Sequence, residues 1–506
     1  MPEVISSVSQ ASGRGVFIIF KAVLDAVLAV GTGRAAMIAQ LPWGPIDTET
    51  PFQDAATFRD LFAPAGFPRT SQGYLMATKF PWIDLQIIRV LGTTPVKATF
   101  TIQNVTPANC LKVDGKYYGA QGNGIQVLIA NATSGTGTSF DMTVSITDAA
   151  TGLVTSEFYQ DVDSTQVADD ATHTYWAGLG ASSKLVAFTK AGTGRPVNGT
   201  YTLASGSDGA AIASGNYLGT PGSADKGLAL LELDADVSFI FTDDPGSTPL
   251  SAVMAGIKAH CVLMKDRRIG VLMGLPAETS TTAKTNAATN AYDHCVYVWP
   301  HGKVLDDQGN KTVIPLSGPL ASFATLLTPH LSIAYKSKAF TKALANLIEL
   351  DASATKATKI DLEKNGVVPF EKSSKTGWFS PYCDVTTSKT SAVFGVRMAD
   401  YIAFSIADTL EEFRGAPNDD ETFEDERTLI DDFGLQLVAN RKRDHIFLPC
   451  INAWQLLPTE ANNTAATIAA GDATHGIRAT LISEQKRIFL VGEIGTTVKI
   501  TASTSA

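Results

Sequence analysis

The chain has 506 residues, of which 44% are hydrophobic and 18% are charged. At about 150 residues per domain, this length predicts about three domains with cores of their own, and it excludes a peptide or a small disulfide-stapled fold. The 50 acidic and 40 basic residues leave a formal net charge of −10, so no bulk positive field is available to hold nucleic acid. The charged share is below the usual share of about a quarter, which suggests that some surface is buried in an assembly.

Residues 1–34 are expected to form an extended arm that carries the apolar run Phe17–Phe20. The longer apolar run Val16–Val30 is interrupted by Lys21 and Asp25, and it is shorter than the roughly 20 residues that span a membrane. It also lacks the positively charged start and the unbroken apolar stretch of a signal peptide. We therefore expect no membrane insertion, and we expect folding in a cytoplasm.

Residues 35–96 are predicted to begin an α/β sheet. Apolar runs at Ala35–Leu41 and Ile83–Val90 predict two strands, and a helix from Ala55 is expected to follow an N-cap at Asp54. Strand, helix and strand at these lengths are typical of an α/β core.

Residues 97–192 differ in composition from the chain on either side. Short alternating runs such as Ile125–Ile129 and Met142–Ile146 are separated there by clusters of Thr, Ser, Gly and Asn. This pattern predicts an inserted all-β domain at the periphery, because polar, turn-rich segments suit solvent.

The α/β core is expected to resume over residues 193–370. Strands are predicted at Val237–Phe241, Ile269–Met273 and Val296–Trp299, with a helix from Thr248-Pro249 to about Met264 between the first two. Further helices are expected at Leu320–Leu327, Phe340–Glu349 and Ala357–Lys364.

Residues 371–495 are expected to form a C-terminal domain. It should contain a helix over Val393–Leu410 and a second helix that starts after Asn418. Residues 496–506 are expected to be an arm, in which Val498 and Ile500 alternate with polar residues. This alternation predicts a terminal strand without a sequence-adjacent partner, so it must pair elsewhere.

Three polar motifs are candidates for chemistry, and a structural interpretation is favoured for each. Gly119–Gly124 is rich enough in glycine to cradle a phosphate, but it has neither the Walker nor the GxGxxG order, so we expect a turn. Gly206–Gly209 sets a hydroxyl beside a carboxylate without forming a GxSxG elbow, and we again expect a turn. Asp243 and Asp244 follow a predicted strand at the sheet edge where α/β enzymes bind ligands. A cap on the following Pro-Gly turn is the favoured interpretation.

The histidines and cysteines indicate no metal or redox site. No HExxH or CxxC motif occurs, and the odd number of cysteines, far apart in the chain, is typical of reduced and buried thiols. We therefore nominate no catalytic residue, no metal ligand and no cofactor. The residues in question are Cys110, Cys261, Cys295, Cys383, Cys450, His173, His260, His294, His301, His330, His445 and His475.

The stretch Asp408–Asp432 holds eleven acidic residues and is followed by the basic triplet Arg441–Arg443. A solvated helix face is the usual interpretation of such a run. The alternative is a docking surface for a partner or an identical subunit, made by Glu411, Glu412, Glu424, Asp425, Glu426, Arg441, Lys442 and Arg443.

The order of motifs along most of the chain resembles the tail sheath proteins of contractile-tailed bacteriophages and related contractile injection systems. The N-terminal half departs from the family pattern at Ala204-Ser205-Gly206, and the C-terminal half at Asp384–Thr387, which implies a divergent subfamily. The motifs that carry the resemblance are Ala39–Pro45, Ala56–Phe62, Tyr117–Asn123, Ser182–Val186, Gly206–Gly209, Tyr217–Gly219, Lys226–Leu228, Leu362–Val367, Phe394–Glu412 and Asp444–Cys450.

The resemblance implies a subtilisin-like α/β core without a catalytic triad, with an inserted all-β domain and an α+β C-terminal domain with extended terminal arms. It implies a structural subunit that stacks as hexameric rings around an inner tail tube protein and contracts to drive the tube through a host envelope. Baseplate and tail terminator proteins are the other implied partners, and the virion tail, assembled in the bacterial cytoplasm, is the implied location. Arm strands that pair between subunits would include Phe17, Ile19, Ile488, Leu490, Val498 and Ile500.

Two other classes of function stay open on the residues alone. An α/β enzyme would use Asp243 or Asp244 at the sheet edge, and it would form a small closed oligomer rather than long tubes. A non-contractile lattice protein or adhesin would use the β insert and would have no inner-tube partner.

Overall fold

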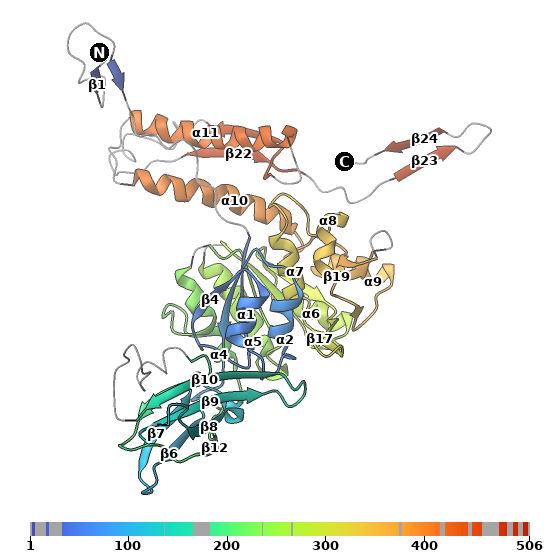
Figure 1. Cartoon of the computed structure of the whole chain (residues 1–506). Coiled ribbons are helices and arrows are strands. Elements are labelled where there is room, and N and C mark those ends of the chain that lie inside the picture. Colours follow the sequence, from blue (N-terminus) through green and yellow to red (C-terminus); the bar gives the residue numbers. More distant parts are fainter. Residues whose placement is uncertain are drawn as a thin grey trace. The chain divides into compact units, whose positions relative to one another are not determined.

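A computed structural model of the chain describes residues 3–5, 17–19, 33–135, 137–164, 183–234, 236–264, 267–373, 377–414, 420–443, 448–457, 475–482, 489–493 and 499–503 (Figure 1). The chain divides into two compact units. The larger unit contains residues 31–327 and 333–396, and the smaller contains residues 1–30, 328–332 and 397–506. Each unit is described by itself below.

The larger unit is built around an eight-stranded sheet with the order β20-β19-β15-β14-β13-β3-β5-β4. The six strands from β19 to β5 run parallel, and the two edge strands are antiparallel to their neighbours. The strands are β3 (Arg34–Ala39), β4 (Glu49–Phe52), β5 (Asp84–Arg89), β13 (Phe239–Thr242), β14 (Ile269–Met273), β15 (Cys295–Trp299), β19 (Val367–Lys372) and β20 (Phe379–Pro381).

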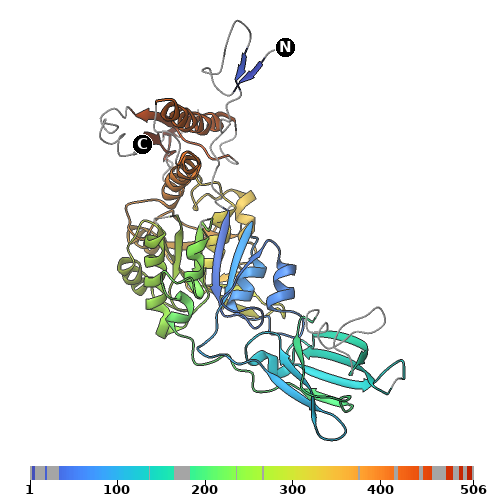
Figure 2. The ribbon, with the colours of Figure 1, turned by 90° about the vertical axis from the view of Figure 1, so that its left-hand side faces the viewer.

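Helices cover both faces of this sheet (Figure 2). The helices are α1 (Ala55–Phe62), α2 (Gln72–Lys79) and α7 (Ser317–Thr325) on one face, with α4 (Ser214–Leu218), α5 (Ser247–Leu263), α6 (Ser280–Thr289) and α9 (Lys356–Lys364) on the other. Short segments complete the unit: η3 (Gly227–Leu233), α8 (Lys338–Thr341), η4 (Lys342–Leu344) and the small sheet β17-β16-β18 (Lys311–Ile314, Gly302–Leu305, Glu349–Leu350).

Local sequence signals account for several of these boundaries. The carboxylate of Asp54 accepts hydrogen bonds from the Ala56 and Thr57 amides at 2.8 Å, which confirms the expected N-cap of α1. The helix expected over Phe340–Glu349 is wrong in its second half. There the Ile348 amide bonds to the Lys303 carbonyl, because the chain leaves the helix to pair with β16.

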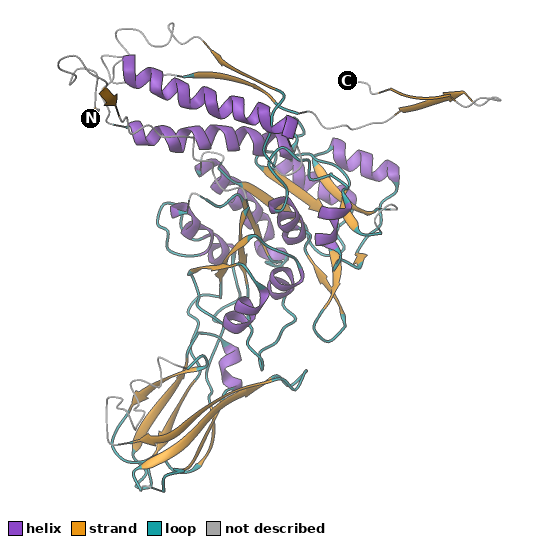
Figure 3. Ribbon diagram, turned by 45° about the horizontal axis from the view of Figure 1, so that its top comes forward, coloured by secondary structure: helices purple, strands orange, loops and turns teal. Residues whose placement is uncertain are grey.

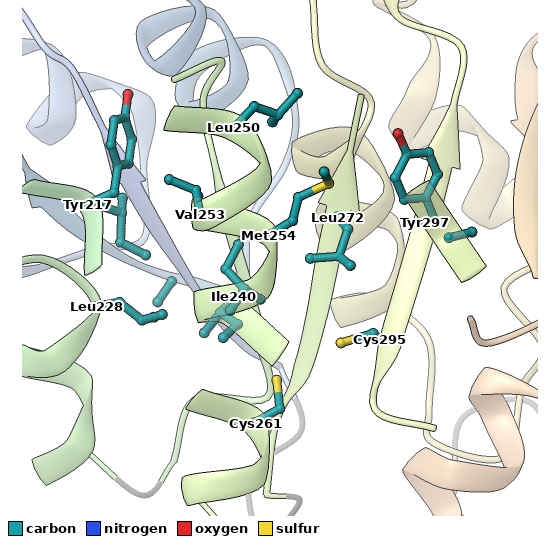
Figure 4. Close-up of a cluster of buried hydrophobic side chains, with 14 of the residues drawn as sticks. Tyr217, Leu228, Ile240, Leu250, Val253, Met254, Cys261, Leu272, Cys295 and Tyr297 are labelled. Atoms are coloured by element: carbon teal, nitrogen blue, oxygen red, sulfur yellow. The ribbon is translucent and has the colours of Figure 1, made fainter. Parts of the chain in front are cut away.

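The main core lies between α5 and the sheet (Figure 4). Ile240 and Leu272 from the strands pack against Leu250, Val253 and Met254 of α5, and all five are at most 6% exposed. At roughly 25 cal/mol per Å² of apolar surface, such burial is the main favourable contribution to folding.

The insert consists of two antiparallel sheets. The orders are β10-β9-β8-β12 and β11-β7-β6, and the apolar residues that alternate along these strands meet between the sheets. β12 follows the expected end of the insert at residue 192, so the sheet reaches further along the chain. The elements are β6 (Thr99–Gln103), β7 (Asn109–Gly115), η2 (Ala120–Gly124), β8 (Gln126–Asn131), β9 (Ser139–Thr147), β10 (Val154–Asp163), β11 (Val186–Lys190) and β12 (Gly199–Thr202).

The smaller unit is built on two long helices and a two-stranded sheet (Figure 3). Its core combines Met398 and Ile402 with Ile430, Phe433 and Leu437. The elements are α10 (Val393–Leu410, which begins in the larger unit), η5 (Glu411–Phe413), α11 (Asp420–Arg443), β21 (Ala453–Leu457) and β22 (Gly476–Thr480), with two further strand pairs, β1 (Glu3–Ile5) with β2 (Phe17–Ile19) and β23 (Phe489–Glu493) with β24 (Lys499–Ser503).

Candidate functional site

The two candidate aspartates at the carboxyl edge of the parallel sheet have different roles. Asp243 is 4% exposed, and its two oxygens accept hydrogen bonds from the Tyr217 hydroxyl at 2.7 Å and the Gln40 amide at 2.8 Å. Asp244 accepts from the Gly246 amide at 2.8 Å. The expected cap on the Pro-Gly turn is therefore made by Asp244, whereas Asp243 is an internal anchor between β3, α4 and β13.

Burial dominates the electrostatics of this anchor. Loss of water raises the pKa of Asp243 to about 7, although its hydrogen bonds act in the opposite direction. The pKa of Tyr217 is also raised, first by burial and then by the neighbouring Asp243 charge. Both Asp243 oxygens are already engaged with backbone or side-chain donors, which is the arrangement of a structural link between elements.

The two glycine-rich motifs lie against each other where the insert joins the core. Asp208 accepts a hydrogen bond from the Ala120 amide at 2.9 Å, at the start of η2. Asn123 and Gly206 exchange two further bonds, at 2.7 and 3.0 Å. The expected turn at Gly119–Gly124 is in fact a short 3₁₀ helix, and the anion at its first amide is a carboxylate of the same chain.

Arg89 binds both the core and the insert at this junction, although no sequence motif points to it. Its guanidinium is fully buried and donates to the carbonyls of Leu41 at 2.7 Å, Gly44 at 2.8 Å and Tyr118 at 3.0 Å. Burial lowers the pKa of Arg89 to about 10, and the charges of Asp208 and Asp47 act against that shift. The signal in the sequence was a single cation inside the apolar run of β5.

A cavity of 470 Å³ adjoins this junction at the ends of β3 and β5. Polar side chains on its lining come from both the core and the insert, and include Gln40, Ser71, Gln121 and Asp208. Within the described ranges, no group of three His, Cys, Asp or Glu side chains is arranged to hold a metal ion.

Three histidines, His260, His294 and His301, are buried within the larger unit, and burial lowers the pKa of His260 and of His301. His260 lies 2.8 Å from an Arg268 nitrogen, and burial, followed by the Arg268 charge, lowers the pKa of His260 to about 3. Burial likewise lowers the pKa of His301 to about 4. Both imidazoles are therefore neutral at physiological pH.

The pairing of the C-terminal strand differs from the expectation. β24, which carries Ile500, pairs antiparallel with β23, which carries Leu490. The expectation that this strand has no sequence-adjacent partner is wrong, because it pairs with β23, the strand that precedes it in the sequence. At the N-terminus, β2 carries Phe17 and Ile19 and pairs parallel with β1. Ile488 and Val498 lie outside the described residues.

The acidic candidates do not form one uniform solvated face. Glu411 is exposed and pairs with Arg414 at 2.6 Å, and Glu412 and Glu424 are also exposed. Glu426 instead makes a 2.5 Å contact with His475, and the side chains of that pair are only 13% and 8% exposed. Asp425 is partly buried on α11, and the basic Arg441 and Lys442 at the end of that helix are exposed, whereas the side chain of Arg443 lies outside the described residues.

No helix in the described part of the chain combines the length and the hydropathy of a transmembrane span. No protein-family model matches the chain. No curated protein matches it either.

Solved structures are similar to this chain over nearly its whole length. A sheath tail protein from Desulfitobacterium hafniense matches 88% of this chain and 93% of its own, with a TM-score of 0.59 at 17% identity. A sheath tail protein from Listeria innocua matches 95% and 96%, with a TM-score of 0.54 at 14% identity. The helical sheath of the anti-feeding prophage in its contracted state matches 96% and 100%, with a TM-score of 0.54 at 11% identity. This chain has the fold of the contractile tail sheath proteins.

Proposed function

We propose that this protein is a structural subunit of a contractile tail sheath, which polymerises around an inner tube and contracts to drive that tube through an envelope. The observation that carries the proposal is the extent of the match, which spans both units and nearly the full length of each sheath protein compared. A fold shared only in the α/β core would favour an enzyme equally well, since such cores serve many functions.

The proposal includes the finer features that the family resemblance implies. The subunits stack as hexameric rings, and the core has subtilisin-like topology without enzymatic activity. Besides itself and the inner tube protein, the subunit meets baseplate and tail terminator proteins. The assembly takes place in the bacterial cytoplasm and the product is a virion tail or a related injection particle.

Electron microscopy of the purified full-length protein tests this function. A sheath subunit forms long tubes or stacked rings with one helical lattice, while an enzyme forms a small closed oligomer. Co-expression with a tail tube protein should give sheathed tubes. Only small closed particles under both conditions would refute the proposal, as would turnover of a substrate that Asp243→Asn abolishes.

Strand exchange by the terminal arms is the second part of the proposal. The β23–β24 hairpin has only two strands, so each strand has one edge whose backbone groups can pair with a neighbouring subunit. The N-terminal strand pair β1–β2 offers edges in the same way. Backbone pairing of this kind links subunits while leaving them free to rotate.

Two C-terminal truncations test the role of the hairpin. Removal of residues 496–506 deletes β24, and it should leave a folded and soluble subunit that fails to polymerise. Removal of residues 504–506 keeps both strands and is the matched control, for which normal tubes are expected. Normal tubes from the longer truncation would contradict strand exchange at this end of the chain.

The charged residues of the smaller unit are proposed to contact the inner tube or an adjacent subunit. Only exposed side chains are suitable for testing this contact, and Glu426 is left out because it contacts His475. Single exposed pairs are worth about 0–1 kcal/mol, yet one weak contact repeated in every subunit adds up along a polymer.

Charge reversal should therefore weaken assembly without unfolding the subunit. The variant Glu412→Lys with Glu424→Lys should assemble poorly on tubes, and its assembly should change its dependence on salt. The matched control is Asp60→Lys with Asp236→Lys, which reverses two exposed carboxylates of the larger unit. If the two variants assemble equally well and with equal salt dependence, these residues form a solvated helix face and not a contact surface.

A further inference from the structure

Two of the five free cysteines meet inside the main core of the larger unit. Cys261 lies near the end of α5 and Cys295 is the first residue of β15, and both are fully buried. Figure 4 shows both sulfur atoms in the space between α5 and the sheet. The other three cysteines lie elsewhere: Cys110 in the core of the insert, Cys383 after β20 and Cys450 in the smaller unit.

A glycine on the strand between them makes this meeting possible. Gly270 of β14 is the register partner of Cys295 on β15. A Cβ atom at Gly270 would lie 3.3 Å from the sulfur of Cys261 and 3.6 Å from that of Cys295. Because that Cβ is absent, both thiols face the same bare stretch of backbone, with no side chain of β14 between them.

The chemistry of the two thiols is linked. The pKa of Cys261 is raised well above its ordinary value, first by its interaction with the Cys295 thiol and then by burial. The Cys261 thiol is therefore protonated in the folded protein, and it reacts only when the end of α5 opens. That end is at the surface, since Val262 and Leu263, next along the chain, are 53% and 51% exposed.

We propose that Cys261 and Cys295 are a latent disulfide pair, which closes when the folded protein meets a low-molecular-weight disulfide and then fastens α5 to β15 across β14. In the first step one thiolate attacks the small disulfide, forms a mixed disulfide and releases one small thiolate. In the second step the other cysteine attacks the protein sulfur of that mixed disulfide and releases the second small thiolate. The two protons leave the protein thiols and end on the two small thiols, and the small disulfide is the oxidant. The inference is independent of the proposed function.

Peptide mapping can detect this cross-link without ambiguity. Folded full-length protein is incubated with oxidised glutathione, quenched with an alkylating agent under denaturing conditions, and digested with trypsin. The two cysteines fall in different tryptic peptides, Ala259–Lys265 and Thr285–Lys303. We expect these peptides to appear joined, and we expect the protein to lose two of its five free thiols.

Single variants separate the pair from the other cysteines. Cys261→Ala and Cys295→Ala should each abolish the joined peptide, and each variant should lose at most one of its four remaining thiols, as the mixed disulfide of the first step. Cys383→Ala, at another buried cysteine, should leave the joined peptide unchanged. Oxidation should also raise the midpoint of thermal unfolding of the wild-type protein and of Cys383→Ala, and it should not do so in Cys261→Ala.

Three results would overturn the inference. The first is retention of all five thiols by the folded protein under conditions in which the urea-unfolded protein forms disulfides. The second is joining of either cysteine to Cys110, Cys383 or Cys450 in preference to its proposed partner. The third is a lower midpoint of thermal unfolding after oxidation, because this would mean that the disulfide distorts the core and does not match the native geometry.

Discussion

Replacing Arg89 tests whether one buried cation holds the insert on the core. Arg89→Met removes the guanidinium and keeps an unbranched apolar side chain that can occupy part of the same space. The carbonyls of Leu41, Gly44 and Tyr118 then lose their donor in a region without solvent. Two of these carbonyls belong to the core and the third to the insert, so both sides of the junction are affected.

The size of the effect follows from two opposing contributions. Hydrogen bonds from a charged donor contribute about 1.5–3 kcal/mol each, which gives about 4–9 kcal/mol for the three. Burial of the cation acts against them: lowering its pKa from 12.5 to about 10 corresponds to about 3 kcal/mol at 1.36 kcal/mol per pKa unit. We expect Arg89→Met to lower the free energy of unfolding by about 3 kcal/mol.

Urea denaturation and hydrogen exchange together measure this loss and locate it. Exchange should accelerate most at the backbone amides of residues 119–124 and 206–209, which meet at the junction. Arg195→Met is the matched control, because Arg195 also donates to several carbonyl oxygens, all of them within the insert. Wild-type stability of Arg89→Met would refute the reasoning, and so would an equal acceleration at the junction in the Arg195→Met control.

Three further variants have defined outcomes. The pKa of Asp243 is raised from 3.8 to about 7, so its contribution to stability is present below about pH 4 and is lost as the pH rises through 7. The wild-type free energy of unfolding, measured by urea denaturation, should therefore fall by about 4 kcal/mol over that pH range, and Asp243→Asn should remove this fall. The same pH dependence in the variant and the wild type would contradict the assignment. Gly434→Ala should destabilise the smaller unit, because the new Cβ would lie 1.9–2.3 Å from the Trp454 indole; thermal unfolding at the wild-type midpoint would be the contrary result. Asp384→Ala should cost about 1–2 kcal/mol in denaturant unfolding, because that carboxylate accepts from the Val393 amide at the start of α10 at 2.6 Å, whereas Asp361→Ala, at an exposed surface pair, should cost much less.

Features set by neighbouring residues were predictable from the sequence, and features set by distant ones were not. The strand at β5 and the cap of α1 depend on residues within a few positions, and both were predicted. The roles of Asp243 and Arg89 depend on partners up to 203 positions away, such as Gln40, and no local pattern encodes them. The pairing of β24 with β23 could not be predicted for a related reason, because the alternating pattern of β24 does not identify its partner.

Two of the motifs that carry the family resemblance also have a structural role, which becomes clear only in the folded chain. Gly119–Gly124 and Gly206–Gly209 each looked like a turn in isolation. Their exchange of hydrogen bonds through Asn123 and Asp208 shows that they form one joint. Glycine is needed at both because their backbones approach closely: a Cβ at Gly206 would lie 2.7 Å from the Gly119 carbonyl oxygen.

The same joint makes the insert a detachable module. The chain leaves the core and returns to it along adjacent paths, since Val96 bridges to Ser207 and Thr99 to Ala204 in antiparallel fashion. The outgoing and returning segments thus lie side by side, and the two attachment points of the insert are already close together. A foreign domain grafted at these points would therefore cost the core little loop-closure entropy. The insert can therefore diverge in sequence, or be exchanged as a whole, while the strand order of the core stays the same.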